Sequence, residues 1–294
     1  MMVGVTAPPS FRLMGIVNVT PDSFSDGGCF ADGEAAIAHG RRLAQEGAAI
    51  IDIGGESTRP GAVPIPVELE RARVEPVIRG LAGAGTRAQI SVDTSKLLVA
   101  EAALRAGATL INDVTAFRAD PQLAGLVADH GADCCLMHML GEPRTMQVDP
   151  RYDDVVDDVR AFLEDRLRFA VGEGVDERRV MLDPGIGFGK TVEHNLALLA
   201  RLDELLTLGR PLVVGTSRKG FLGQIAASHP GPDRARGVLE RLPGTLATNV
   251  LALERGASVF RVHDVRASRD ALLVAAATLT GRWTARSTRT TPTS

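Results

Sequence analysis

The sequence predicts a single α/β domain, a (β/α)8 barrel of the TIM type, and three observations carry this prediction. Eight short apolar runs recur along the 294 residues, and a stretch of helical character follows each run. The runs are rich in β-branched residues and almost uninterrupted by polar ones, which is typical of parallel strands buried on both faces. Polar residues, glycine or proline close nearly every run. Because a barrel brings the carboxyl ends of all its strands to one face, that face is the predicted active site.

The first apolar run, residues 12–17, opens the predicted barrel, and the helix after it is expected over 32–46. Asp32 is suited to cap the start of this helix and Gly47 to end it. The seven further strands are expected at 48–53, 88–92, 109–113, 133–138, 179–183, 211–216 and 258–262. Their helices are expected at 67–83, 95–106, 121–131, 153–173, 191–207, 241–256 and 266–280.

Eight such units also fit an open doubly wound sheet, in which only the strands at the switch point deliver residues to a ligand. The strand ends favour the barrel, because polar chemistry follows all eight. In chain order the ends carry Asn18, Asp52 with residues 54–60, Asp93, Asn112 with Asp113, His138, residues 183–185, residues 217–219, and Arg261 with His263. We therefore expect one barrel domain over residues 1–282 and a disordered Thr/Ser/Arg-rich tail over 283–294.

The composition excludes several classes of protein. Lysine and arginine (33) nearly balance aspartate and glutamate (36), and only 4% of the residues are aromatic. A nucleic-acid surface needs a basic field and stacking rings, so no nucleic-acid partner is expected. No run of 18 apolar residues and no signal peptide is visible, and the three cysteines form neither a disulfide framework nor a metal-binding spacing. These features predict a cytoplasmic protein without membrane contact.

Two loops on the predicted active face have the composition of mobile lids. Residues 18–28 combine Pro, Asp, Ser and Gly, and Asn18 at their start is a candidate ligand for Mg²⁺ or phosphate; the alternative is that it caps the turn. Residues 54–62 present Arg59, which suits a bidentate anion clamp. The alternative for Arg59 is an ordinary surface role, since arginine is abundant in this chain.

Three acids, Asp93, Asp113 and Asp183, stand with Asn112 at the ends of apolar runs, where an unpaired carboxylate is costly. A divalent metal is one possible partner, although the three acids show no distinctive ligand spacing. A heterocycle is another, because a cyclic amidine edge offers a carboxylate two parallel N–H donors. A third reading makes each acid the N-cap of the helix that follows, and this reading has most weight for Asp93.

The glycine-rich segment 183–191 does not match a nucleotide-binding loop. Pro184 stands where a P-loop requires glycine, and the glycines have G-x-G-x-G spacing rather than the Rossmann pattern. Proline and glycine instead allow the backbone to lie against a flat ligand, with Phe188 as a wall. Barrels commonly hold phosphate after strands seven and eight. The residues there that suit this use are Ser217, Lys219, Arg261 and His263.

With these motifs assembled, the chain resembles the dihydropteroate synthase family from Met14 to about Ala276. The resemblance rests on MGIVNVTPDSFSDGG (14–28), DIGGESTRPGA (52–62), SVDT (91–94), IND (111–113), MHM (137–139), DPGIGFGK (183–190), TSRKGF (216–221) and RVHDVR (261–266). It implies a transferase of folate biosynthesis and sulfonamide target that joins 4-aminobenzoate to a 7,8-dihydropterin-6-ylmethyl diphosphate. It further implies release of pyrophosphate, a Mg²⁺ cofactor and a homodimer.

The resemblance also implies roles for individual residues, with Asp93, Lys219, Arg261 and His263 as the catalytic ones. The pterin slot is implied to use Asp93, Asn112, Met137, Asp183 and Lys219, with Phe188 and Gly215 beside it. Asn18, Arg261 and His263 are implied to bind the diphosphate, with Asn18 as the Mg²⁺ ligand. The aminobenzoate pocket is implied to use Phe24, Thr58, Pro60 and Lys219, with Arg59 ordering the closed loops.

The reaction implied by the resemblance is dissociative and needs no covalent nucleophile. One departure is Gly220, where some relatives place a serine that bonds the aminobenzoate carboxylate; a backbone N–H at a helix start is the expected substitute. Three rival functions remain: a pterin-binding methyl transferase, a non-enzymatic pterin-binding paralogue and a phosphosugar barrel enzyme. The first does not require the aminobenzoate loops, the second is expected to lose loop residues, and the third leaves the three pocket acids unexplained.

Overall fold

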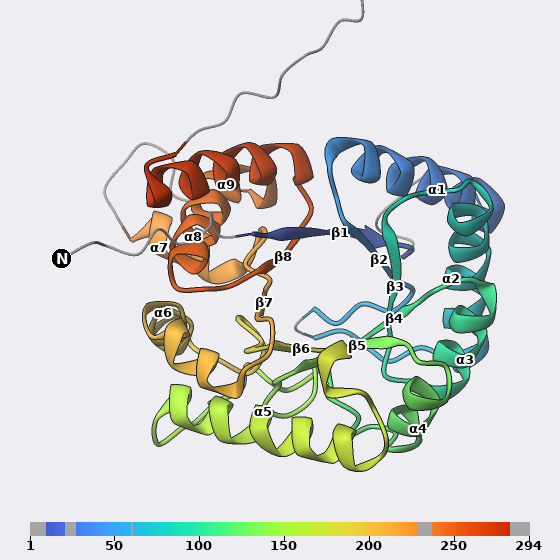
Figure 1. Cartoon of the computed structure of the whole chain (residues 1–294), viewed down its shortest axis with the longest axis horizontal. Coiled ribbons are helices and arrows are strands. Elements are labelled where there is room, and N and C mark those ends of the chain that lie inside the picture. The colour runs from blue at the N-terminus through green and yellow to red at the C-terminus, as the bar shows by residue number, and fades with distance from the viewer. Residues whose placement is uncertain (1–9, 21–27, 60, 229–236, 283–294) are drawn as a thin grey trace, which may run out of the picture.

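The computed structural model describes residues 10–20, 28–59, 61–228 and 237–282 and confirms the eight-stranded barrel (Figure 1). The tail expected over 283–294 lies outside the described residues. The parallel strands are β1 (Arg12–Asn18), β2 (Ile50–Gly54), β3 (Gln89–Asp93), β4 (Leu110–Asp113), β5 (Asp133–Met137), β6 (Val180–Asp183), β7 (Val213–Val214) and β8 (Val259–Val262).

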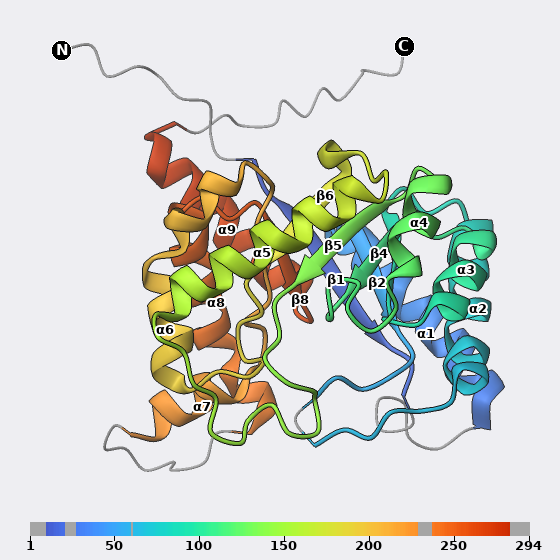
Figure 2. The same cartoon turned by 90° about the horizontal axis from the view of Figure 1, so that it is seen from below.

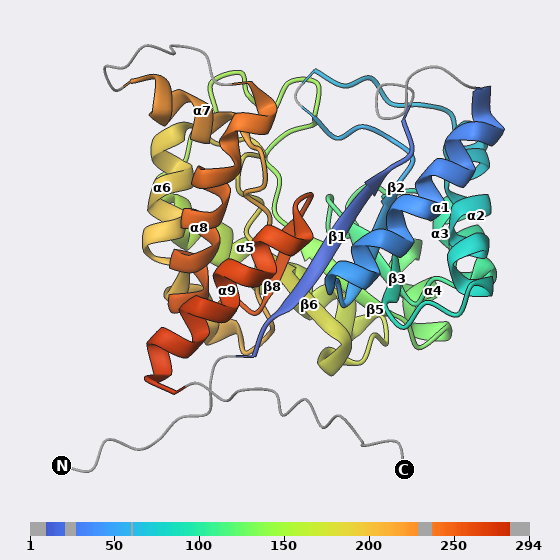
Figure 3. The same ribbon diagram turned by 90° about the horizontal axis from the view of Figure 1, so that it is seen from above.

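The strands pair in the order β6-β5-β4-β3-β2-β1-β8-β7, and the barrel is nearly closed between β6 and β7. There Leu182 and Leu212 form a single parallel bridge, and the Leu182 amide donates to the Pro211 carbonyl at 3.0 Å. In the side views of Figures 2 and 3, the loops that follow β2 and β5 gather with helix α7 (Gly220–Ala227) at one end of the barrel. This end is the shared face for the carboxyl ends of the strands.

Helices surround the strands (Figure 1) because each presents an apolar side to the sheet and a polar side to solvent. The remaining α-helices are α1 (Gly28–Glu46), α2 (Val67–Gly83), α3 (Leu97–Ala106), α4 (Gln122–Asp129), α5 (Val155–Gly172), α6 (Val192–Ala200), α8 (Leu242–Glu254) and α9 (Val265–Thr280). Short 3₁₀ helices are η1 (Glu177–Arg179), η2 (Leu202–Leu208) and η3 (Val238–Arg241).

Three of the helix predictions were wrong. Helix α1 begins at Gly28, so Asp32 lies inside the helix rather than at its cap. The helix predicted over 191–207 is interrupted at Arg201, whose φ of −115° leaves the helical conformation. Helix α7 was missing from the predicted helix ranges, although a helix start at Gly220 was expected as a donor; its sequence begins with Gly220 and contains Gly223, and glycine is a weak helix former.

The barrel interior is filled in layers, and these layers explain where the site lies. Every strand except β3 contributes one residue to an apolar interior cluster: Met14, Ile50, Leu110, Cys135, Met181, Val213 and Val259. Because side chains alternate between the two faces of a strand, the residue two positions further along also faces the interior, one layer nearer the carboxyl end. This second layer consists of Ile16, Asp52, Asn112, Met137, Asp183, Gly215 and Arg261. The interior therefore changes from apolar to charged toward the shared face.

Two further observations concern the expected environment of the chain. Within the described ranges, no helix is long and apolar enough to cross a membrane. Cys134 and Cys135 are free thiols buried in the barrel wall and interior, and burial raises the pKa of both above the usual thiol range. Neither is placed to act as a nucleophile.

Candidate active site

A large cavity, with a volume of about 2120 Å³, lies over the carboxyl ends of the strands. Pockets for one small ligand are about 300–1,000 Å³, so this cavity has room for two. Each of the eight strands, or the loop directly after it, contributes to the lining, including Asn18, Glu56, Asp93, Asn112, Met137, Asp183, Ser217 and Arg261. The structure thus brings the predicted strand-end residues together on one face.

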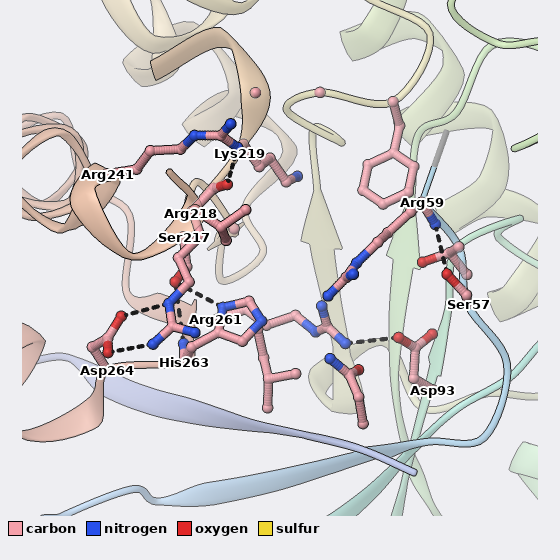
Figure 4. A pocket seen from close by; sticks show the side chains of 18 of the residues that line it. Ser57, Arg59, Asp93, Ser217, Arg218, Lys219, Arg241, Arg261, His263 and Asp264 are labelled. Atoms are coloured by element: carbon pink, nitrogen blue, oxygen red, sulfur yellow. Dashed lines mark hydrogen bonds and ion pairs between the residues drawn. The ribbon is translucent and has the colours of Figure 1, made fainter. Parts of the chain in front are cut away.

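Arg261 crosses the floor of the cavity between two carboxylates. Its Nη2 donates to Asp93 Oδ2 at 2.7 Å (Figure 4). Its Nε donates to Asp52 Oδ2, also at 2.7 Å. Asp52 is fully buried and also accepts from Ser91 Oγ at 2.6 Å and from Asn112 Nδ2 at 3.0 Å. One guanidinium therefore ties together strands β2, β3 and β8.

Asp93 keeps one oxygen without a partner. Its Oδ1 atom is buried and makes no hydrogen bond within the described part of the chain. Burial raises the pKa of Asp93 to about 7, against the lowering effect of Arg261 and with a further raising effect from Asp52. Burial lowers the pKa of Arg261, but Asp52 and Asp93 outweigh it and hold that pKa above its usual range. The Asp93 carboxyl group is thus poised to accept a donor from a ligand.

A second acid, Asp183, lies across the cavity beside Lys219. Its Oδ1 accepts from the Gly185 amide at 2.7 Å, and burial raises its pKa while Lys219 opposes the rise. The Lys219 ammonium donates to the Ile186 carbonyl and lies 4.5 Å from the centre of the Phe188 ring. Burial lowers the pKa of Lys219 to about 8, with Asp183 acting in the opposite direction. This side of the cavity therefore offers an acceptor and a cation close to an aromatic wall.

The loop between Asp183 and Lys190 forms that wall and is fixed from outside. Phe188 packs on an apolar cluster made of Val114, Met137, Met139 and Met146. Four successive carbonyls of the loop each accept from a different side chain: Ile186 from Lys219, Gly187 from Gln147 at 2.7 Å, Phe188 from Lys190 at 3.0 Å, and Gly189 from Tyr152 at 2.7 Å. The loop is consequently a rigid surface against which a flat ligand can lie.

Ser217 and His263 form the opposite end of the cavity. Ser217 Oγ accepts from the His263 amide at 3.2 Å and lies 3.0 Å from His263 Nδ1 (Figure 4). A serine hydroxyl donates one bond and accepts up to two, so Ser217 Oγ can donate to an unprotonated Nδ1 while it accepts from the amide; in that tautomer the ring proton is on Nε2. Burial lowers the pKa of His263 to about 3, helped by Arg218 and Arg261. The imidazole is therefore neutral and presents one N–H donor.

The loops that overhang this end carry three of the predicted residues. Asn18 ends β1, and a Cβ at Gly54 would lie 3.8 Å from Asn18 Oδ1 and 3.7 Å from Asp93 Oδ2, so glycine keeps this space open. Thr58 is half-buried, and Arg59 extends toward Arg261 (Figure 4). Phe24 and Pro60 lie outside the described residues. No three His, Cys, Asp or Glu side chains among the described residues are grouped to hold a metal ion.

One predicted pocket acid has a different role. Asp113 does not line the cavity; its carboxylate accepts from the amides of Thr115 and Phe117, both at 2.7 Å. It closes its own loop, where Ala116 and Phe117 have φ of 53° and 63°. Of the readings left open for Asp113, the structure favours local satisfaction, by the amides of its own turn rather than by the start of the next helix.

Two functional features were missed from the sequence. The first is the role of Asp52, which stood among the polar strand ends but received no function, although its alternation with Ile50 places it inside the barrel. Lys190 is almost fully buried, and its Nζ lies 2.8 Å from His138 Nδ1 and bonds the Phe188 carbonyl. Burial lowers the pKa of Lys190 well below its usual range. Only its place in a glycine-rich motif marked this lysine in the sequence.

Comparison with known proteins finds a family model and sequence relatives that agree with one another. A family model described as pterin binding enzyme matches residues 14–263. A dihydropteroate synthase of Mycobacterium leprae is 46% identical over 270 residues, which cover 91% of this chain and 93% of the relative.

Solved structures agree with the sequence relatives. A Xanthomonas albilineans dihydropteroate synthase with 4-aminobenzoic acid has a TM-score of 0.83 and 49% identity, covering 92% of this chain and 93% of that one. The enzyme from the same organism in complex with 7,8-dihydropteroate has a TM-score of 0.81 and 45% identity, covering 94% and 97%.

The loop between Asp183 and Lys190 (the wall loop) leads to a prediction about stability at Gly185. This residue has a φ of 66°, and an added Cβ would lie 1.8 Å from the His138 carbonyl oxygen. We expect Gly185→Ala to lower the free energy of unfolding by about 3 kcal/mol or more, because left-handed strain and a backbone clash add.

Urea denaturation measures this difference. The matched control is Gly125→Ala in α4, where an added Cβ meets nothing within 4 Å. That substitution should raise the free energy of unfolding by up to about 1 kcal/mol. Equal stability of the two variants would contradict the role given to the wall loop.

Proposed function

The chain belongs to the dihydropteroate synthases of the pterin-binding enzyme family, and from this premise we propose which residues perform its reaction. The enzyme acts in folate biosynthesis and transfers a pterin-methyl group. The family is a target of sulfonamide drugs, one of which is bound in the Yersinia pestis dihydropteroate synthase. The substrates are a 7,8-dihydropterin-6-ylmethyl diphosphate and 4-aminobenzoate, and the products are 7,8-dihydropteroate and pyrophosphate.

The observation that carries the pterin assignment is the buried, unpartnered Oδ1 atom of Asp93. A buried acceptor without a donor costs free energy, and an N–H of a dihydropterin ring supplies that donor. The Asp183 carboxylate accepts from the amidine edge of the ring, with Asn112 beside it. Phe188 and Met137 contact the faces of the ring. At the remaining residue of the slot, Gly215, a Cβ would lie 3.7 Å from Arg261 Cβ, so glycine leaves space above the guanidinium.

The diphosphate is assigned to the end where Arg261, Ser217 and the Nε2–H of His263 meet, with Arg59 above it. Mg²⁺ in such sites is held by one or two protein oxygens together with substrate phosphates and water. The amide oxygen of Asn18, which faces the same space as Asp93, fits that pattern. When bound there, Mg²⁺ would neutralise charge on the departing diphosphate.

The 4-aminobenzoate pocket is assigned to Lys219, Thr58, Phe24 and Pro60. Lys219 supplies a cation for the carboxylate or for the aromatic ring. Gly220 is the first residue of α7, and an added side chain there would meet nothing within 4 Å. The backbone amides that open α7 therefore replace the serine hydroxyl of relatives as donors to the carboxylate.

The reaction proposed for these groups is dissociative. The bond between the pterin methylene carbon and the diphosphate oxygen breaks, and its electron pair leaves with the diphosphate. Arg261 and His263 stabilise the charge that develops on the leaving group. The lone pair of the aminobenzoate amine then forms the C–N bond, and the amine releases one proton. The rigid wall at Phe188 and the loops over the cavity exclude water from the cation.

Two broader properties are also proposed. Exposed apolar side chains gather on α8 and α9, namely Leu251, Leu273, Val274 and Leu279, and a shallow groove lies along α9. Such a surface favours a homodimer. The buried free thiols of Cys134 and Cys135 favour a cytoplasmic location.

Incubating the enzyme with the pterin diphosphate, Mg²⁺ and 4-aminobenzoate tests the proposed reaction. Dihydropteroate should form only in the complete mixture, in equal amount to pyrophosphate. Tight pterin binding without product would instead indicate a binding protein, and methyl transfer from a pterin donor would indicate the methyl-transferase alternative.

Asp183→Asn should abolish pterin binding while the fold survives. The substitution keeps the size of the side chain but places an amide donor opposite the N–H donors of the ring in a buried slot, so affinity should fall by at least about 100-fold. Calorimetric titration with a pterin measures it. Asp157→Asn, on the exposed side of α5, is the control and should bind normally. Wild-type affinity of the Asp183→Asn enzyme would remove Asp183 from the slot.

The two substrates should bind in a coupled order. Thr58 and Arg59 belong to a loop that overhangs both the diphosphate and aminobenzoate positions, so ordering by one ligand assists the other. We expect 4-aminobenzoate to bind at least about 10-fold more tightly, with a pterin present, when Mg²⁺ and pyrophosphate are added. Equal dissociation constants with and without pyrophosphate would show that the pocket is preformed.

A further inference from the structure

The turn after β7 contains a residue in a rarely populated backbone conformation. Arg218 has a φ of 60°, in the left-handed region that residues other than glycine seldom adopt. Of its neighbours in sequence, Ser217 is buried and Lys219 is half-buried, and they face the cavity at opposite ends of the proposed substrates. Because φ at Arg218 sets the direction of the chain between them, it also sets how these two side chains point.

Side chains from the segment that follows α7 hold this backbone in place. The Arg218 amide donates to Thr245 Oγ1 at 3.1 Å, and the Arg218 carbonyl accepts from Arg241 Nη1 at 3.0 Å. Thr245 Oγ1 in turn donates to the Arg241 carbonyl at 3.1 Å. Thr245 is fully buried and does not line the cavity. Both the N–H and the C=O of Arg218 are thereby satisfied in this conformation.

The Arg218 side chain connects the turn to the loop after β8. Its Nε donates to Asp264 Oδ2 at 3.0 Å and its Nη2 to Asp264 Oδ1 at 2.7 Å, in a two-point ion pair (Figure 4). Asp264 directly follows His263, which bonds Ser217. Planar two-point pairs of this kind fix orientation as well as distance. The loops after β7 and β8 are thus joined twice, once through Ser217 and His263 and once through Arg218 and Asp264.

We propose that Thr245, Arg218 and Asp264 are positioning residues for the reaction. They hold the 216–219 turn in its left-handed form, and so fix Ser217 and Lys219 relative to His263. None of the three needs to touch the reacting atoms. The inference rests on the roles proposed above for Ser217, Lys219 and His263. It adds that the geometry of the site depends on a buried hydroxyl group outside it.

The sharpest test replaces Thr245 by valine, which has nearly the same size but no hydroxyl group. Thr245→Val removes the acceptor for the Arg218 amide, and kcat/KM should fall about 10-fold. Thr245→Ser keeps the hydroxyl and should stay within about 2-fold of the wild type under the same relation. Thermal unfolding of both variants shows whether the loss of kcat/KM results from a loss of stability. A fall in Tm for Thr245→Val with unchanged kcat/KM at a temperature where it is folded would overturn the proposal.

A second test separates the backbone from the ion pair. Arg218→Ala and Arg218→Gly both remove the pair with Asp264, but glycine adopts a positive φ without strain. We expect kcat/KM to fall about 50-fold for alanine and about 10-fold for glycine. Arg178→Ala, which removes a two-point pair with Asp176 on the surface, is the control and should leave activity unchanged. Equal losses in the Arg218→Ala and Arg218→Gly enzymes would overturn the backbone argument.

Measuring the binding of inorganic pyrophosphate with Mg²⁺ distinguishes failure of the positioning role from failure of the role proposed for Ser217. Ser217→Ala should weaken pyrophosphate binding if Ser217 belongs to the anion site, and Thr245→Val should then weaken it as well. Weakening by Ser217→Ala alone would overturn the positioning role. Weakening by Thr245→Val alone would support positioning, here through His263, and refute the role proposed for Ser217.

Discussion

The guanidinium of Arg261, held between Asp52 and Asp93, is the contact on which the mouth of this barrel depends. A buried carboxylate without a counterion is costly, and here one cation offsets two carboxylates on different strands. Ser91 and Asn112 complete the hydrogen bonding of Asp52, so the cluster reaches four of the eight strands. The interior above the apolar layer is therefore a connected set of charges rather than separate polar residues.

The charge balance of this cluster bears on the chemistry. Three buried acids, Asp52, Asp93 and Asp183, lie with the cations Arg261 and Lys219, and the buried Lys190 also acts on Asp183. Burial raises the pKa of Asp93 and of Asp183, which shows how little solvent stabilises these carboxylates. In the proposed reaction the pterin becomes positive as the diphosphate leaves. The acids that accept N–H bonds from the ground state then interact more strongly with the cation, which is the differential binding that catalysis requires.

The sequence was informative wherever strand geometry alone places a residue. Strand ends must converge in a barrel, so Asn112, Asp183 and Arg261 could be predicted to meet. Asp52 was placed at a strand end but its role as a partner of Arg261 was missed, although its pairing with Ser91 in the β2–β3 register puts both in the interior.

Other features of the site leave only a weak signal in the sequence, or none. The sequence left the partner of Asp113 open, because the backbone amides that it bonds belong to its own turn. The positive φ of Arg218 has no sequence signal, because only the surrounding side chains make that conformation favourable. The proposed positioning residue Thr245 is equally hidden, since nothing near it in sequence carries chemistry.

The site combines rigid walls with a cation that can exchange its partners. The wall loop is held by four side chains, and Arg261 is fixed by two carboxylates, so neither is expected to move far. Lys219 differs, because among the described residues its ammonium bonds the neutral Ile186 carbonyl and lies over the face of Phe188. An ammonium group paired with a carboxylate gains the attraction of two full charges, which a neutral carbonyl does not supply. The carboxylate of 4-aminobenzoate therefore competes well for Lys219, and the second substrate reorients this one side chain within a frame that the barrel has already set.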